Sequence, residues 1–144
     1  MSWELCIENK LINCQRDGHV YCNVLNDAII LDLQGKTLAT TGISMNYEDA
    51  QNLKKFFEQV INTILYLKLG DKKYRILHFE QNKLAYIRDG EVGGTVAKSN
   101  TLYIIGFFNN NKIYTYDGEK KIQCPGMCNT VVEELANELK SEGF

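Results

Sequence analysis

The sequence has no apolar run long enough to cross a membrane, and it begins with neither the basic segment nor the apolar centre of a signal peptide. It also has no strong excess of either charge, because 16 Lys and Arg residues oppose 18 Asp and Glu residues. The resulting net charge of −2 argues against the basic face or arm that a general nucleic-acid-binding protein needs. We therefore expect a cytoplasmic protein that does not bind nucleic acid.

Motifs for catalysis and metal binding are also missing. The five cysteines form no Cys-x-x-Cys pair, and with only two histidines as nitrogen ligands the spacing argues against a structural zinc site. The glycine-rich stretch 90–94 lacks Gly-Lys-Ser/Thr and precedes no expected helix, so we interpret it as a turn. We expect a protein that is not an enzyme and holds no cofactor. A thiol-dependent enzyme is the alternative, and it predicts one cysteine of unusually low pKa.

What the chain does contain is a core of ordinary size. Its 144 residues, 44% hydrophobic and 24% charged, suit a single domain. In the central stretch 69–108, short runs rich in aromatic and branched residues alternate with polar or glycine-containing turns. The expected strands are 74–79, 84–88, 95–98 and 101–108. Connections this short leave no room for crossover helices, so we expect an antiparallel meander.

The segments on either side of the meander supply helices and two further hairpins. Apolar residues at helical spacing predict helices over 3–13, from Asn46 or Tyr47 through Val60, Ile61 and Ile64, and after Pro125-Gly126. The runs 28–31 and 37–40 should extend the sheet as a hairpin, whereas 15–23 reads as a loop or weak edge strand. Segments 112–116 and 121–124 predict a small projecting hairpin whose Tyr114 and Tyr116 alternate with polar residues, as in an exposed ribbon.

These patterns together predict an α+β fold, a single-domain α/β/α sandwich with a central antiparallel sheet. Several segments, in the same order along nearly the whole chain, also resemble profilin. They are Met1-Ser2-Trp3, Ala28-Ile29-Ile30 with Gly35 and Ala39, Leu69-Gly70 with Lys73-Tyr74, Ile87-Arg88 before Gly93-Gly94, and Pro125-Gly126-Met127-Cys128-Asn129-Thr130-Val131-Val132-Glu133. The resemblance implies one domain over 1–144, with the N- and C-terminal helices packed together on one face of the sheet. Residues 109–124 do not match and look like an inserted β-hairpin.

The resemblance also implies a function, the binding of monomeric actin and the regulation of filament assembly by a monomeric protein. The family's actin-contact positions fall on Ile64, Lys73, Arg75, Leu77, His78, Arg88, Lys98, Gly126, Asn129 and Glu134. They come from the meander and the start of the last helix, so we expect one surface with several basic residues that faces an acidic partner.

Two further partners are implied, proline-rich peptides and phosphoinositide lipids. The groove for proline-rich peptides would be built from Trp3, Cys6, Leu38, Glu138, Leu139 and Phe144. Cys6 stands where the family usually has an aromatic residue, Leu38 where it has tryptophan, and Glu138 where it has histidine or tyrosine. We therefore expect weak or altered peptide binding, and Trp3 and Phe144 have the alternative role of holding the termini together.

For lipids, the family's basic loop reads Arg88-Asp89-Gly90-Glu91 in this chain, so two acids offset the arginine and attraction to an anionic membrane should be small. Lys120 and Lys121 on the expected hairpin would be the compensating charges.

A different class of function also stays open, a scaffold or regulatory module of another small sandwich family of the longin or roadblock type. Geometry distinguishes a profilin from such a module, because profilin requires Trp3 and Phe144 to lie close together on adjacent terminal helices.

Overall fold

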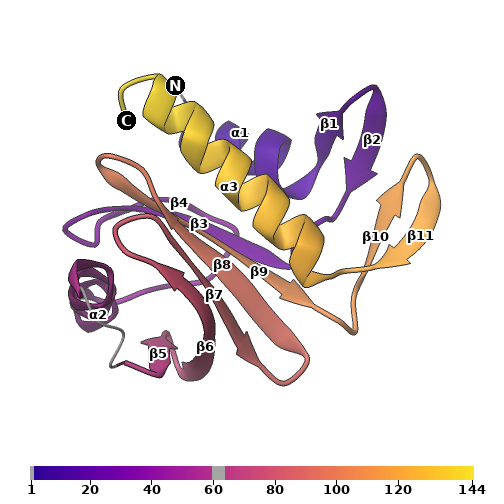
Figure 1. The fold of residues 1–144 in the computed structure, drawn as a ribbon. Helices are drawn as coiled ribbons and strands as arrows, with labels where there is room; N and C mark the ends of the chain where they lie inside the picture. The colour runs from indigo at the N-terminus through magenta and orange to yellow at the C-terminus, as the bar shows by residue number, and fades with distance from the viewer. Residues whose placement is uncertain (1, 60–63) are drawn as a thin grey trace.

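The computed structural model describes residues 2–59 and 64–144. Its centre is a seven-stranded antiparallel sheet in the order β4-β3-β9-β8-β7-β6-β5 (Figure 1). The strands are β3 (Asp27–Asp32), β4 (Thr37–Thr40), β5 (Tyr66–Leu69), β6 (Lys72–Glu80), β7 (Leu84–Asp89), β8 (Val92–Lys98) and β9 (Leu102–Asn109). The predicted meander and the predicted 28–40 hairpin are confirmed. β5 was not predicted, although its alternation of exposed Tyr66 and Lys68 with buried Leu67 and Leu69 is typical of an edge strand.

The sheet has a layer of helices on each face. On one side, α1 (Trp3–Ile7), the π-helical turn η1 (Glu8–Ile12) and α3 (Pro125–Ser141) pack on β3, β4, β8 and β9. On the other side, α2 (Tyr47–Glu58) packs against a second apolar cluster of the same sheet. The predicted α/β/α sandwich, with both terminal helices on one face, is therefore confirmed. No helix in the described part of the chain is long and apolar enough to cross a membrane.

α2 begins where its sequence predicts. The side chain of Asn46 accepts the N–H of Asp49 at 2.8 Å, and the Asp49 carboxylate accepts the N–H of Asn46 at 3.1 Å, which makes a capping box. The same carboxylate accepts the N–H of Gly70 at 3.1 Å, so it also ties the helix to the β5–β6 turn. α2 ends at Glu58. The predicted extension through Val60 and Ile61 lies outside the described residues, and Ile64 is not helical.

α3 packs close to the sheet because β9 has a glycine beneath it. A Cβ added at Gly106 would meet Val132 of α3 and Leu25, each at 2.6 Å. The predicted apolar face of the helix is buried, from Cys128 through Leu139. At the other terminus, the helix predicted over 3–13 is divided into α1 and η1, and its apolar residues Ile7 and Leu11 are buried as expected.

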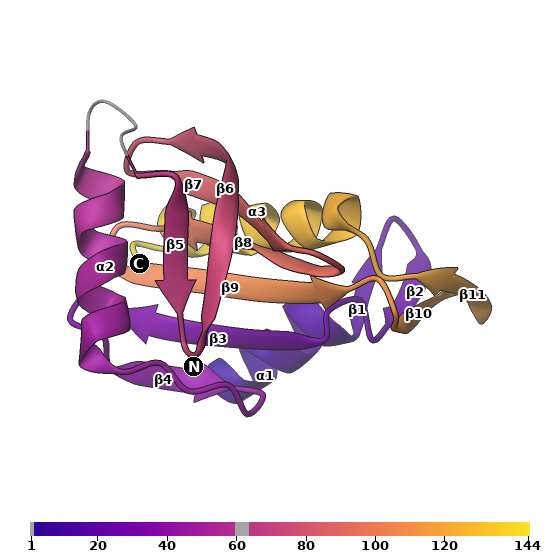
Figure 2. The ribbon, with the colours of Figure 1, turned by 90° about the horizontal axis from the view of Figure 1, so that it is seen from below.

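A second, four-stranded sheet was not predicted. It joins β1 (Cys14–Arg16), β2 (His19–Cys22), β10 (Ile113–Tyr116) and β11 (Glu119–Ile122) in the order β1-β2-β10-β11. The 15–23 segment, expected to be a loop or a weak edge strand, forms a hairpin in which β1 is an edge strand of this sheet. Asp17 and Gly18 have φ angles of 54° and 81°, as a tight two-residue turn requires. The predicted hairpin β10–β11 exists, but it pairs with β2 and buries Tyr114, so the expectation of an exposed ribbon was wrong. Figure 2 shows this sheet at the opposite end of the molecule from α2.

Candidate functional site

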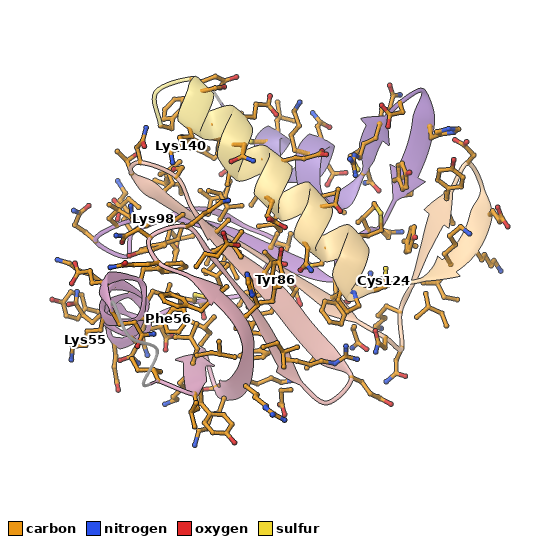
Figure 3. The ribbon with its side chains drawn as sticks, viewed as in Figure 1. Lys55, Phe56, Tyr86, Lys98, Cys124 and Lys140 are labelled. Atoms are coloured by element: carbon orange, nitrogen blue, oxygen red, sulfur yellow. The ribbon has the colours of Figure 1, made fainter. Side chains whose placement is uncertain are left out.

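The helices on the α3 side leave the strands β5 and β6 and the end of β7 near Arg88 uncovered. Residues paired directly across antiparallel strands lie on the same face. The pairs are Lys68 with Lys73, Arg75 with Arg88, and His78 with Tyr86. Tyr86 contacts α3, which fixes this as the α3 side of the sheet (Figure 3). We call the exposed and half-buried residues of this side the open face, namely Tyr66, Lys68, Lys73, Arg75, Leu77, His78, Tyr86 and Arg88.

The open face is hollowed rather than flat. A depression of about 360 Å³ is lined by Tyr66, Lys73, Arg75, Leu77, Arg88, Asp89 and Gly90. Tyr66 is 49% exposed and Leu77 57% exposed, so large apolar groups lie among the cations. The Lys73 ammonium lies 4.5 Å from the centroid of the Tyr66 ring, a cation–π contact. Apolar groups within a rim of charge are typical of a surface that docks another protein.

Like charges face one another across the strands of the open face. Arg75 lies opposite Arg88, and Lys68 lies opposite Lys73. Within the described residues, none of these four cations has a carboxylate at salt-bridge distance. Directly opposed like charges destabilise a sheet. The arrangement therefore suits an acidic partner better than it suits the isolated protein.

The start of α3 adjoins the open face. The hydroxyl of Tyr86 donates to Glu133 of α3 at 2.8 Å, and burial together with this hydrogen bond raises the pKa of Tyr86 to about 12. One turn earlier, Asn129 accepts a hydrogen bond from Thr95 of β8. Gly126 is exposed at the first turn of the helix. The strands and the helix thus form one continuous surface.

Most of the residues predicted for actin binding lie on this surface, and three do not. Those brought together are Lys73, Arg75, Leu77, His78, Arg88, Gly126 and Asn129. Lys98 pairs with Tyr103, which faces α2, so it lies on the opposite side of the sheet. Glu134 forms a 2.5 Å ion pair with Arg16 of β1 on the other flank of α3, and Ile64 packs in the cluster beneath α2.

Sequence reasoning missed four residues of the surface, namely Tyr66, Lys68, Tyr86 and Glu133. Tyr86 is two residues before Arg88 on the same strand, so strand alternation places both on one face and would have found it. Tyr66 and Lys68 belong to the strand that was not predicted. Glu133 and Glu134 are neighbours in sequence, but a helix turns about 100° per residue, so only Glu133 reaches β7.

A second candidate site lies between the terminal helices. The rings of Trp3 and Phe144 meet edge to face with centroids 5.2 Å apart. Cys6 and Leu38 are partly buried beside them, Leu139 is fully buried, and the Glu138 carboxylate pairs with Lys10 at 3.3 Å. A shallow depression of about 250 Å³ follows the two helices past Leu5, Cys6 and Leu139. The predicted closeness of Trp3 and Phe144 is confirmed.

Phe144 is also held by contacts other than the one with Trp3. Its main-chain oxygen accepts hydrogen bonds from the amide of Thr101 at 2.7 Å and from the hydroxyl of Ser99 at 2.8 Å. The chain end therefore rests on the β8–β9 turn. This position fits both predicted roles of the aromatic pair, as part of a groove and as a clasp between the termini.

Three cysteines have a pKa shifted from the ordinary thiol value, and none of the three shifts is the one that activates a nucleophile. Burial raises the pKa of Cys6 and of Cys14, and it raises the pKa of the fully buried Cys128 to about 12. An activated cysteine has the opposite shift. The two histidine rings pair with carboxylates, His19 with Asp117 and His78 with Glu80.

The chain resembles proteins of one family in sequence and in fold. A family model described as Profilin matches residues 1–144. Acanthamoeba castellanii profilin IB is 25% identical with a TM-score of 0.69, and the match covers 84% of this chain and 89% of that one. LokiProfilin1, solved in complex with rabbit actin, is 17% identical with a TM-score of 0.61 and coverages of 82% and 84%. Mouse profilin IIa, solved with a double repeat from the FH1 domain of mDia1, is 14% identical with a TM-score of 0.59 and coverages of 83% and 89%.

Proposed function

Because the chain belongs to the profilin family, we propose that it binds monomeric actin and thereby regulates filament assembly in the cytoplasm. Bound monomers would be withheld from spontaneous nucleation and delivered to growing filament ends, and nucleotide exchange on actin would be affected. The protein itself needs no catalytic group for this role. Family membership also removes the longin or roadblock alternative. The similar LokiProfilin1 was solved with actin, which supports this choice of partner.

The observation that carries the proposal is the set of opposed cations on the open face, none of which has a carboxylate partner within the described residues. Lys73, Arg75 and Arg88 surround the exposed Leu77, with no carboxylate of the described chain at salt-bridge distance. A partner that presents carboxylates around an apolar contact would neutralise this repulsion and bury Leu77 at once. We assign the binding surface to the open face together with Gly126, Asn129 and Glu133. Lys98, Glu134 and Ile64 lie outside it.

Binding of proline-rich peptides is proposed to be weak. Trp3 and Phe144 provide one aromatic pair, but Cys6 and Leu38 supply no ring next to it. Glu138 has no hydrogen to donate to a peptide carbonyl, and its carboxylate is paired with Lys10. If each missing aromatic anchor contributed about 1 kcal/mol or more, affinity would be roughly tenfold to a hundredfold lower than with a complete groove. Mouse profilin IIa, solved with an FH1 repeat, supports this class of ligand.

Binding of phosphoinositide lipids at the Arg88 loop is proposed to be weak as well. Arg88 donates from Nε to the main-chain oxygen of Gly90 at 2.9 Å and lies over the ring of Phe108, so its own loop already engages it. Asp89 and Glu91 are exposed beside it. Lys120 and Lys121 are on β11 of the second sheet, apart from this loop.

Actin assembly kinetics test the proposal. Purified protein added to monomeric actin should lengthen the nucleation lag, because bound monomers cannot join a nucleus. The double charge reversal K73E/R88E should relieve this effect, whereas K120E, on the second sheet, should leave it unchanged. Identical assembly curves with and without the wild-type protein would count against actin binding. Equal loss in K73E/R88E and K120E would count against the open face as its site.

A further inference from the structure

A larger pocket lies on the other side of the main sheet from the open face. It has a volume of about 720 Å³, within the range of small-molecule sites. Its walls come from α2, from the β3–β4, β6–β7 and β8–β9 turns, and from the end of α3. The lining residues are Leu33, Gln34, Tyr47, Gln51, Lys54, Phe57, Glu58, Asn82, Lys98, Ser99, Asn100, Tyr103 and Lys140. We call it the α2 pocket.

Three lysines from three different elements line the α2 pocket. Lys54 is on α2. Lys98 ends β8 and Lys140 is in the last turn of α3, and both are labelled in Figure 3. In the part of the chain that the structure describes, none of them has a carboxylate at salt-bridge distance. Within residues 2–59 and 64–144, the Lys98 ammonium donates only to the main-chain oxygen of Ser99, at 3.2 Å. Glu58 is the one acid among the lining residues, so the pocket has an excess of two positive charges although the whole chain has a net charge of −2.

The pocket also presents unused hydrogen-bonding groups above an apolar floor. The floor is the stacked pair Phe57 and Tyr103, with ring centroids 5.7 Å apart and both rings buried. Tyr47 stands at the rim and is 72% exposed. Four side-chain amides complete the lining, and among the described residues none has a side-chain hydrogen bond. They are Gln34, Gln51, Asn82 and Asn100.

We propose that the α2 pocket binds a small molecule that carries two or more phosphate groups and sugar-type hydroxyls. Ammonium groups bind phosphate as compact charges, and three of them reaching one pocket from separate elements match a ligand of high charge density. Amides donate to phosphate oxygens and exchange hydrogen bonds with hydroxyls. A peptide of isolated carboxylates would spread its charge beyond a pocket of this size. The site is separate from the open face and does not rest on actin binding.

Calorimetric titration with adenosine triphosphate, which carries both groups, tests the proposal. The wild-type protein should bind one equivalent. The triple variant K54Q/K98Q/K140Q should bind at least about tenfold more weakly, because three charge-assisted contacts are removed. The matched control K55Q/K112Q/K120Q makes the same change of charge at lysines that do not line the pocket, and it should bind within about twofold of wild type. Thermal unfolding of both variants would show that they are folded.

The open face is the competing site for any anion, so R75Q/R88Q is a necessary third variant. Affinity retained in R75Q/R88Q and lost in the pocket variant would support the α2 pocket. No binding to the wild-type protein, equal loss in the control, or loss only in R75Q/R88Q would overturn it. Vesicles containing phosphatidylinositol bisphosphate distinguish the source of the phosphates, because pocket-dependent vesicle binding would identify the ligand as a lipid headgroup. The pocket variant should still suppress actin nucleation. A negative result for the α2 pocket would therefore leave the actin proposal standing, and a negative result with actin would leave the pocket proposal standing.

Discussion

Asp117, in the β10–β11 turn, attaches that hairpin to β2. One of its carboxylate oxygens accepts the amide of Val20 at 2.7 Å, and the other lies 2.6 Å from the ring Nδ1 of His19. The Val20 hydrogen bond, followed by the His19 contact, lowers the pKa of Asp117 below its ordinary 3.8. These contacts favour the ionised form, so their contribution to stability is present above the ordinary pKa. It is lost as the pH falls through the lowered pKa.

We predict that the substitution Asp117→Ala loosens this attachment at neutral pH. Hydrogen exchange at the Val20 amide should become faster by at least about fivefold, because its acceptor is gone, while exchange at Ile104 in the central strand should not change. In the wild-type protein, acidification through the lowered pKa of Asp117 should cause the same local loss of protection. Unchanged protection of Val20 in the variant would show that the carboxylate does not hold the hairpin.

Residue spacing explains why only part of the predicted site forms one surface. Lys73 and Arg75 are two apart on one strand, so alternation alone places them together, and Arg88 joins them through the β6–β7 register. Lys98 was assigned to the same surface, but it lies three residues after Thr95, which faces α3, and an odd spacing along a strand changes the face. The sequence showed that each residue was polar and on a strand. It did not show which strand edge α3 would leave uncovered.

At the scale of elements, the second sheet depends on contacts between distant parts of the chain. β10 pairs with β2 through Tyr116 and Tyr21, and Tyr114 is buried in the cluster beneath α3. The neighbouring Ile113 points to the other side of the strand and is 53% exposed. The hairpin is therefore an integral part of the fold at its Tyr114 side and accessible at its Ile113 side.

Substitutions at these two adjacent positions should differ in their effect on stability. Tyr114→Ala should lower the free energy of unfolding by about 2–4 kcal/mol, because it leaves a cavity beneath α3. Ile113→Ala should change it by less than about 0.5 kcal/mol, as is usual for an exposed position. Urea denaturation of the two variants measures both values. Equal effects, or a larger effect at Ile113, would contradict the described packing of the hairpin.

The groove between the terminal helices leads to a gain-of-function prediction. Cys6→Tyr would add a ring beside Trp3 and Phe144, where the wild-type side chain offers none. Affinity for a proline decamer should rise by about fivefold or more, which corresponds to about 1 kcal/mol. Fluorescence of Trp3, the single tryptophan, reports binding directly. Tight binding by the wild-type protein, or no gain in the variant, would mean that the missing rings are not what limits the groove.

The elements differ in how well sequence predicts them, and the difference follows from the range of their contacts. The meander and α2 are specified locally, by alternation, short turns and the capping box at Asn46, and both were predicted. The second sheet needs β2 and β10 to meet although about 90 residues separate them, and no local pattern encodes such a pairing. A local signal for β1 and β2 was nevertheless present. Asp17-Gly18 is the same turn pair as Asp117-Gly118, and both have positive φ angles.

For the whole molecule, the sheet separates two surfaces of different character. The open face is broad and basic and contains exposed Tyr66 and Leu77, which suits a protein partner. The α2 pocket, on the opposite face, is lined by lysines and amides and suits a small anion. No residue is shared between the two linings. Ligand binding at one should therefore be separable by mutation from binding at the other.

The most direct test of the central claim is a calorimetric titration of monomeric actin with the wild-type protein and two charge-reversal variants. R75E/R88E changes the opposed arginines of the open face, and K98E changes a lysine on the other side of the sheet. The wild-type protein should bind actin in a one-to-one complex, R75E/R88E should bind at least about tenfold more weakly, and K98E should bind within about twofold of wild type. No binding by the wild-type protein, or a loss in K98E as large as that in R75E/R88E, would contradict the claim that the open face is an actin-binding surface.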